Sequence, residues 1–137
     1  MNLLIDANII LEISLDQEKA EESRQFLNSF QEHEFFMTDF SIHSIGVILY
    51  FRDRKEGFQY FLHDVISKMD VGIAVLSLED MNGVLEVSEK FGLDFDDSYQ
   101  YMAAKKYGLT LVSFDSHFDK TDLKRKTPGQ IIKRNNL

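Results

Sequence analysis

Three aspartates stand where predicted secondary-structure elements begin or end. Asp6 directly follows the short apolar run at residues 3–5, and Asp115 directly follows the apolar run at residues 109–114. Asp97 opens a helical segment that leads into the second of these runs. If the two runs are neighbouring parallel strands, their carboxyl ends meet at one edge of a sheet, and the three carboxylates lie close together. Clustered carboxylates repel each other, so one of them takes up a proton unless a cation joins them.

A cluster of aspartates alone predicts a particular class of cation. Mg²⁺ prefers oxygen ligands and keeps several waters beside one or two carboxylates, so an oxygen-only site favours Mg²⁺ or Mn²⁺ over Zn²⁺. Such a cation can activate a water molecule and stabilise charge on a phosphodiester. Each residue also has an ordinary structural explanation. Asp96 and Asp97 suit the first turn of a helix, where the dipole favours negative charge, and Asp115 suits a turn after a strand.

Other catalytic chemistries find little support in the sequence. The chain has no Cys, which excludes disulfides and thiolate metal sites. It has neither a Gly-rich phosphate loop nor a G-x-S-x-G nucleophile elbow. The four histidines show no metal-ligand spacing, and we expect each to be a surface or capping residue: His33, His43, His63 and His117.

Length and composition predict one soluble domain. The chain has 137 residues, close to the common size of a domain, and its hydrophobic content of 44% is ample for a core. No apolar run approaches the ~18 residues that a membrane span needs, and no basic segment precedes an apolar stretch at the N-terminus. We therefore expect a single cytoplasmic domain over residues 1–137, without membrane contact.

Charge is distributed unevenly along the chain. The net charge is −8, which argues against a general nucleic-acid-binding protein. Residues 1–104 hold 7 basic and 20 acidic residues, whereas residues 105–137 hold 8 basic and 3 acidic ones. The basic end is either a solvated surface or a local phosphate-binding patch.

Strands alternate with helices along the chain. The apolar runs are typical of strands covered on both faces, and the segments between them show helical spacing of apolar residues. Gly92 and Gly108 close two of the helices. The predicted strands are residues 3–5, 35–37, 73–78 and 109–114, with 130–132 as a candidate fifth, and the predicted helices are 17–31, 38–51, 56–69, 79–91 and 97–107. This order predicts a three-layer α/β/α sandwich with a central parallel sheet of four to five strands.

Two stretches carry a resemblance to a known family. "LLIDANIIL" (residues 3–11) and "LDFDDSYQYMAAKKYGLTLVSFDSHFD" (residues 93–119) resemble PIN-domain proteins. The toxin ribonucleases of bacterial and archaeal toxin–antitoxin pairs, the VapC type, are similar. The resemblance covers nearly the whole chain and implies a PIN-like fold. It also implies an endoribonuclease that depends on Mg²⁺ or Mn²⁺, with an antitoxin protein as a partner.

The resemblance implies roles for the residues of this chain that match positions in the family pattern. Asp6, Asp97 and Asp115 match the catalytic and metal-binding acids, and Asp119 matches a further metal-binding acid of some members. Asn8 and Ser113 match polar residues that steady the cluster by hydrogen bonds, and we expect Asp96 and Ser44 to support it as well. The basic residues expected to hold the RNA backbone are Lys105, Lys120, Lys124, Arg125 and Lys126.

One position departs from the family pattern. Family members commonly carry a Glu in the helix after the second strand, where this chain has about Ser44, with His43 beside it. Asp39, one turn earlier, suits a helix cap. The missing acid keeps a second interpretation open, a catalytically weak PIN fold that binds RNA or protein. A third, a phosphoacceptor receiver domain, needs a Lys beyond a late strand, and the nearest is Lys120.

Aromatic residues are dense in one part of the chain. We expect most of them to lie in the core, and the surplus to form a homodimer or antitoxin-binding surface. They are Phe26, Phe30, Phe35, Phe36, Phe40, Tyr50, Phe51, Phe58, Tyr60 and Phe61.

Overall fold

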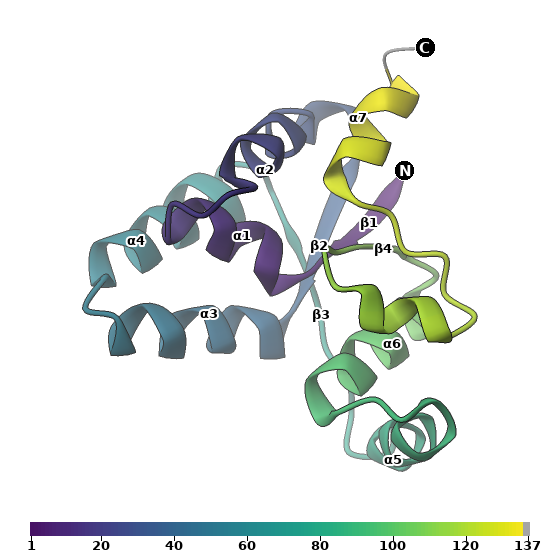
Figure 1. Cartoon of the computed structure of the whole chain (residues 1–137). Helices are drawn as coiled ribbons and strands as arrows, with labels where there is room; N and C mark the ends of the chain where they lie inside the picture. The colour runs from purple at the N-terminus through teal and green to yellow at the C-terminus, as the bar shows by residue number, and fades with distance from the viewer. Residues whose placement is uncertain (136–137) are drawn as a thin grey trace.

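The computed structural model describes residues 1–135 and is built around a parallel sheet of four strands (Figure 1). The strand order is β3-β2-β1-β4, so β1 lies between β2 and β4. The strands are β1 (Asn2–Ile5), β2 (Glu34–Thr38), β3 (Gly72–Ala74) and β4 (Thr110–Val112). The four predicted strands are therefore confirmed, although β3 and β4 are shorter than predicted.

Helices cover both faces of this sheet. The α-helices are α1 (Ala7–Ser14), α2 (Ala20–Leu27), α3 (Asp39–Phe51), α4 (Lys55–Tyr60), α5 (Met81–Phe91), α6 (Phe95–Tyr107) and α7 (Pro128–Asn135). Two 3₁₀ turns, η1 (Phe30–Glu32) and η3 (Ser116–Lys120), and a π-helical segment, η2 (Phe61–Ser67), complete the set. Figure 1 shows α1 to α4 on one side of the sheet and α5 and α6 on the other.

The core alternates along the central strand. Leu3 and Ile5 pack with residues of α1, α2, α3 and η2, whereas Leu4 packs with residues of α5, α6 and η3. Successive side chains of a strand point to opposite faces, so β1 contributes to both layers of the core. The predicted three-layer α/β/α sandwich is the observed architecture.

Residues 130–132 form part of a helix, so the predicted fifth strand is wrong. The Thr127 backbone N–H donates to Gln130 Oε1 (2.9 Å), and the Gln130 backbone N–H donates to Thr127 Oγ1 (3.3 Å). This reciprocal capping box, followed by Pro128 at the first helical position, starts α7 instead. A strand-like contact does occur earlier, because Lys126 forms an isolated parallel bridge with Val112.

Several helix boundaries also differ from prediction. The sequence assigns no element to residues 7–14, which form α1. The predicted helix at residues 56–69 is divided into α4 and η2, and that at residues 17–31 is shortened to α2 and η1. The helix expected to open at Asp97 begins at Phe95. No helix within residues 1–135 combines the length and apolar character needed to cross a bilayer.

Candidate metal centre

The register of the sheet brings the ends of β1 and β4 together. Ile5 pairs with Val112, and the Asp6 backbone N–H donates to the Val112 carbonyl (3.0 Å). Asp6 and the residues that follow β4 therefore lie at one edge of the sheet. This edge is where ligands bind in open α/β sheets.

Asp6 is held at this edge by three hydrogen bonds. It is the N-cap of α1, where its Oδ1 accepts from the Ala7 backbone N–H (2.8 Å). The same oxygen accepts from Gln100 Nε2 (3.3 Å), and Oδ2 accepts from Ser113 Oγ (2.6 Å). Burial raises the pKa of Asp6, and the nearby charge of Asp115 raises it further against the opposing effect of these donors.

Ser113 links the ends of the two central strands. Its hydroxyl donates to Asp6 and accepts from Asn8 Nδ2 (3.2 Å) and from the Asp115 backbone N–H (2.9 Å). Asn8 Oδ1 in turn accepts from the Phe114 backbone N–H (3.4 Å). Asn8 and Ser113 thus hold the loop after β4 against α1, and they fix Asp6 relative to Asp115.

Asp97, Asp115 and His117 form the tightest group of metal-ligating side chains in residues 1–135. One potential ligand atom from each residue lies within 4.8 Å of the others. Asp97 lies in the first turn of α6, and Asp115 is the N-cap of η3. The His117 Nδ1 is 3.2 Å from Asp115 Oδ1 and 3.5 Å from Asp97 Oδ2. The two aspartates meet as predicted, whereas His117 was expected to be a surface or capping residue.

Negative charge accumulates at Asp97. Burial raises the pKa of its carboxyl to about 6, with further contributions from the charges of Asp94, Asp115 and Asp6, and His117 opposes the shift. A carboxylate that is hard to ionise beside others marks a site where a cation would relieve repulsion. The donor set of two carboxylates and one imidazole, open to water, fits a divalent cation.

The sequence matches a known family over most of its length. Residues 3–124 match the PIN domain. The chain belongs to the PIN domain family. No curated protein shows a significant sequence match to the chain.

Solved structures share the fold of this PIN domain at low sequence identity. One is VapBC2 from Rickettsia felis bound to a DNA fragment from its promoter, with a TM-score of 0.74, 16% identity, and coverage of 93% of this chain and 98% of that one. A toxin–antitoxin complex from Klebsiella pneumoniae gives 0.68 at 15% identity, with 92% and 97% covered. PAE2754 from Pyrobaculum aerophilum gives 0.67 at 20% identity, with 98% and 96% covered.

Asp119 and Arg125 are paired with each other in this PIN domain. Arg125 donates from Nε to Asp119 Oδ1 (2.9 Å) and from Nη2 to Asp119 Oδ2 (3.0 Å), and its Nη1 reaches the Ser113 carbonyl (3.1 Å). A bidentate pair uses both carboxylate oxygens and most of the guanidinium. Each group is therefore engaged by the other in this structure, and the metal role of Asp119 and the RNA contact of Arg125 stay predictions.

The remaining predicted basic residues are dispersed. Lys105 is paired with Asp122 (2.6 Å), Lys126 contributes its backbone to the bridge with β4, and Lys124 is exposed. Lys120 donates to the Gly92 carbonyl (3.1 Å) and lines a hollow of about 210 Å³ together with Asp97 and His117. Of the five predicted residues, Lys120 and Arg125 thus lie beside the carboxylate cluster, and Arg125 is also paired with Asp119.

Two predicted supporting residues lie outside the cluster. Asp96 is exposed in the first turn of α6, and Ser44 is half-buried on α3. Neither belongs to the group of ligating atoms around Asp97. Asp39 accepts a hydrogen bond from the Tyr99 hydroxyl (2.8 Å) on α6. Its carboxylate is therefore engaged by Tyr99 and does not take the place of the Glu that family members commonly carry.

A buried polar network behind Asp6 was missed from the sequence. Gln100, which contacts Asp6, also accepts from Thr38 Oγ1 (2.9 Å), and that hydroxyl lies 3.0 Å from Ser41 Oγ. All three side chains are buried. The spacing of Asp97 and Gln100 was a usable signal, because residues three apart share one face of a helix.

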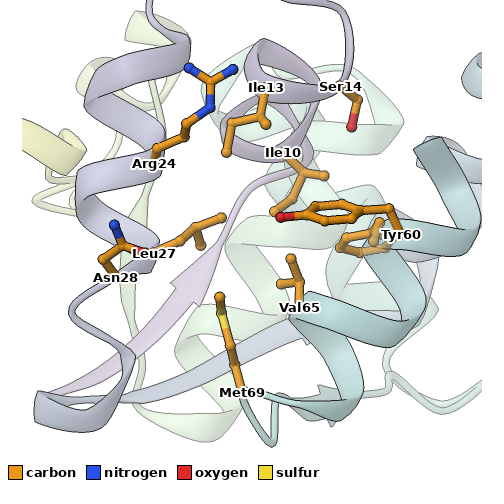
Figure 2. A pocket seen from close by; sticks show the side chains of 10 residues that line it. Ile10, Ile13, Ser14, Arg24, Leu27, Asn28, Tyr60, Val65 and Met69 are labelled. Atoms are coloured by element: carbon orange, nitrogen blue, oxygen red, sulfur yellow. The ribbon is translucent and has the colours of Figure 1, made fainter.

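A second cavity of about 160 Å³ lies between α1, α2 and the α4–η2 segment. Figure 2 shows Ile10, Leu27, Val65 and Met69 converging on it, with Arg24 at one side. No carboxylate or imidazole is among the residues that line it. This cavity therefore lacks the groups that could hold a metal ion, in contrast to the cluster around Asp97 and Asp115.

Proposed function

We propose that this PIN domain is an endoribonuclease that depends on Mg²⁺ or Mn²⁺. The observation that carries the proposal is the convergence of Asp97 and Asp115 beside Asp6 at the carboxyl edge of the sheet. The three carboxylates come from three separate elements, so their meeting is a product of the fold rather than of local sequence.

Each residue of the cluster has a defined part in this proposal. Asp97 and Asp115 hold the cation, which when bound supplies an activated water and stabilises charge on the phosphodiester. Asp6 adds negative charge beside them, and Ser113 fixes its orientation. Lys120, which shares the hollow with Asp97, is placed to contact a phosphate of the RNA. We infer that the protein acts on this RNA in the cytoplasm.

The proposal is tested by RNA cleavage with purified protein. We expect cleavage with Mn²⁺ or Mg²⁺ and none with chelator, and Asp97→Asn should slow it by roughly 100-fold. The matched control is Asp53→Asn, because Asp53 is exposed and its positive φ of 55° suits Asn. Cleavage by Asp97→Asn at the full rate would show that the assignment is wrong.

A protein partner belongs to the same proposal. Similar folds occur in toxin–antitoxin complexes, and we infer that this chain is the toxin of such a pair. Antitoxin binding predicts that a short protein encoded in the neighbouring reading frame co-purifies with the chain. Failure of that protein to bind would separate a solitary nuclease from a toxin.

Exposed apolar side chains on α3 support self-association. Phe51 is 89% exposed, and with Val47, Leu11 and Leu15 it lines a hollow of about 480 Å³ next to Asn8. We infer that a second copy covers this face. Light scattering should give twice the monomer mass of 16.0 kDa, and Phe51→Ser should return it to one. A wild-type monomer at high concentration would contradict the homodimer.

A binding module without catalysis is the second candidate. It is favoured by Ser44, which stands where family members commonly carry an acid, and by Asp39, which is engaged by Tyr99. The two candidates differ in metal binding, because a cation that binds the folded state must raise stability. A melting temperature unchanged by millimolar Mn²⁺ would favour the binding module.

A further inference from the structure

His117 reaches the carboxylate cluster from its solvent side. Its side chain is 66% exposed, and its Nδ1 approaches both Asp115 (3.2 Å) and Asp97 (3.5 Å). Its backbone N–H also donates to Asp115 Oδ1 (2.8 Å), which fixes the start of η3 beside the cluster. One imidazole nitrogen therefore faces two carboxylates that come from different elements.

An ion pair alone explains this placement poorly. An exposed pair contributes about 0–1 kcal/mol, and His63 shows the ordinary form, an exposed imidazole beside its sequence neighbour Asp64. His117 differs because its Nδ1 lies within the 4.8 Å group of ligating atoms with Asp97 and Asp115. A nitrogen that completes a set of three donors has the placement of a metal ligand.

We propose that His117 Nδ1 binds the cation together with Asp97 and Asp115, so that the site prefers a transition-metal ion to Mg²⁺. Imidazole nitrogen is a good ligand for Zn²⁺ and other transition metals, whereas Mg²⁺ favours oxygen and water. At a site of this kind affinity rises from Mn²⁺ to Co²⁺. The inference rests on the proposed metal-dependent function. It adds a nitrogen ligand to the oxygen ligands expected from the sequence, and so it changes which cation the site should prefer.

Calorimetric titration of the chelator-treated protein tests the inference without an activity assay. Wild type should bind Co²⁺ more tightly than Mg²⁺. His117→Ala should weaken Co²⁺ binding by roughly 10-fold or more and leave Mg²⁺ binding unchanged. His63→Ala is the matched control, because it removes an exposed imidazole outside the cluster, and it should bind both ions as wild type does. In ¹⁵N spectra, Zn²⁺ should shift the His117 Nδ1 resonance.

Two results would overturn the inference, and they separate it from the function on which it rests. If Co²⁺ binds His117→Ala as tightly as wild type while Asp97→Asn weakens it, His117 is not a ligand and the metal-dependent function stands. If Asp97→Asn also leaves Co²⁺ binding unchanged, the metal centre itself is refuted.

Discussion

Burial and neighbouring negative charges both oppose the ionisation of Asp97 in the candidate site. Its side chain is 13% exposed, it faces two other carboxylates of the cluster, and its pKa is raised to about 6. The positive end of α6 offsets only part of this repulsion. A group kept at such a position for binding lowers the stability of the metal-free protein, as functional residues often do.

Asp97→Asn should therefore stabilise the metal-free protein in a pH-dependent way. Between pH 4 and about 6 the folded state retains a proton that the unfolded state has lost, so stability falls as pH rises through this window. Asn cannot ionise and escapes this loss. In chelator at pH 7 we expect its melting temperature to exceed that of wild type by roughly 5 °C, with the difference vanishing near pH 4.

Thermal unfolding at both pH values measures this effect. Asp53→Asn should follow wild type throughout, because Asp53 lies on the exposed surface away from the cluster. A stabilisation of Asp97→Asn that is equal at pH 4 and pH 7 would contradict the electrostatic explanation.

At the scale of elements, α6 organises the site. It carries Asp97 toward Asp115 and His117, and Gln100, one turn later, toward Asp6. The Asp94 side chain caps this helix by accepting from the Asp97 backbone N–H (2.9 Å). Through Gln100 the helix also reaches Thr38 at the end of β2, so one helix contacts residues at the ends of both β1 and β2.

Gln100→Leu should destabilise the protein and loosen Asp6. The change keeps a similar volume but leaves the Thr38 hydroxyl buried with one partner fewer, which costs about 1–3 kcal/mol. Removing a donor to Asp6 also raises the pKa of that carboxyl. Urea unfolding measures the loss, with Gln59→Leu on the exposed side of α4 as control. An unfolding free energy equal to that of wild type would show that the network is not structural.

Elements with strong local signals were predictable from the sequence. Thr38 caps α3 as expected, and Gly92 and Gly108 end α5 and α6 with φ values of +66° and +63°. Residues 3–11 form an apolar run that only Asp6 and Asn8 interrupt, so its helical part, α1, has no clear signal in the sequence. Residues 130–132 are helical rather than a fifth strand because the reciprocal cap of Thr127 and Gln130 starts α7.

For the molecule as a whole, the strand order of the sheet explains why the meeting of Asp6 and Asp115 could be predicted from the sequence. Asp6 follows β1 and Asp115 lies just beyond β4, and these two parallel strands are neighbours. The carboxyl ends of neighbouring parallel strands lie at the same edge of the sheet, so the sequence is enough to predict that the two aspartates meet there. The strand order does not determine which exposed side chains pair with each other. Asp119 pairs with Arg125, and His117 joins the carboxylates, because of the path of the loop after β4. Sequence spacing alone does not fix that path.

We propose that a divalent cation binds where Asp97 and Asp115 meet. The most direct measurement is a crystal structure after soaking with Mn²⁺, with the ion located by its anomalous scattering. We expect a peak in contact with carboxylate oxygens of Asp97 and Asp115. Full occupancy of other sites by Mn²⁺, with no peak between these two aspartates, would contradict it.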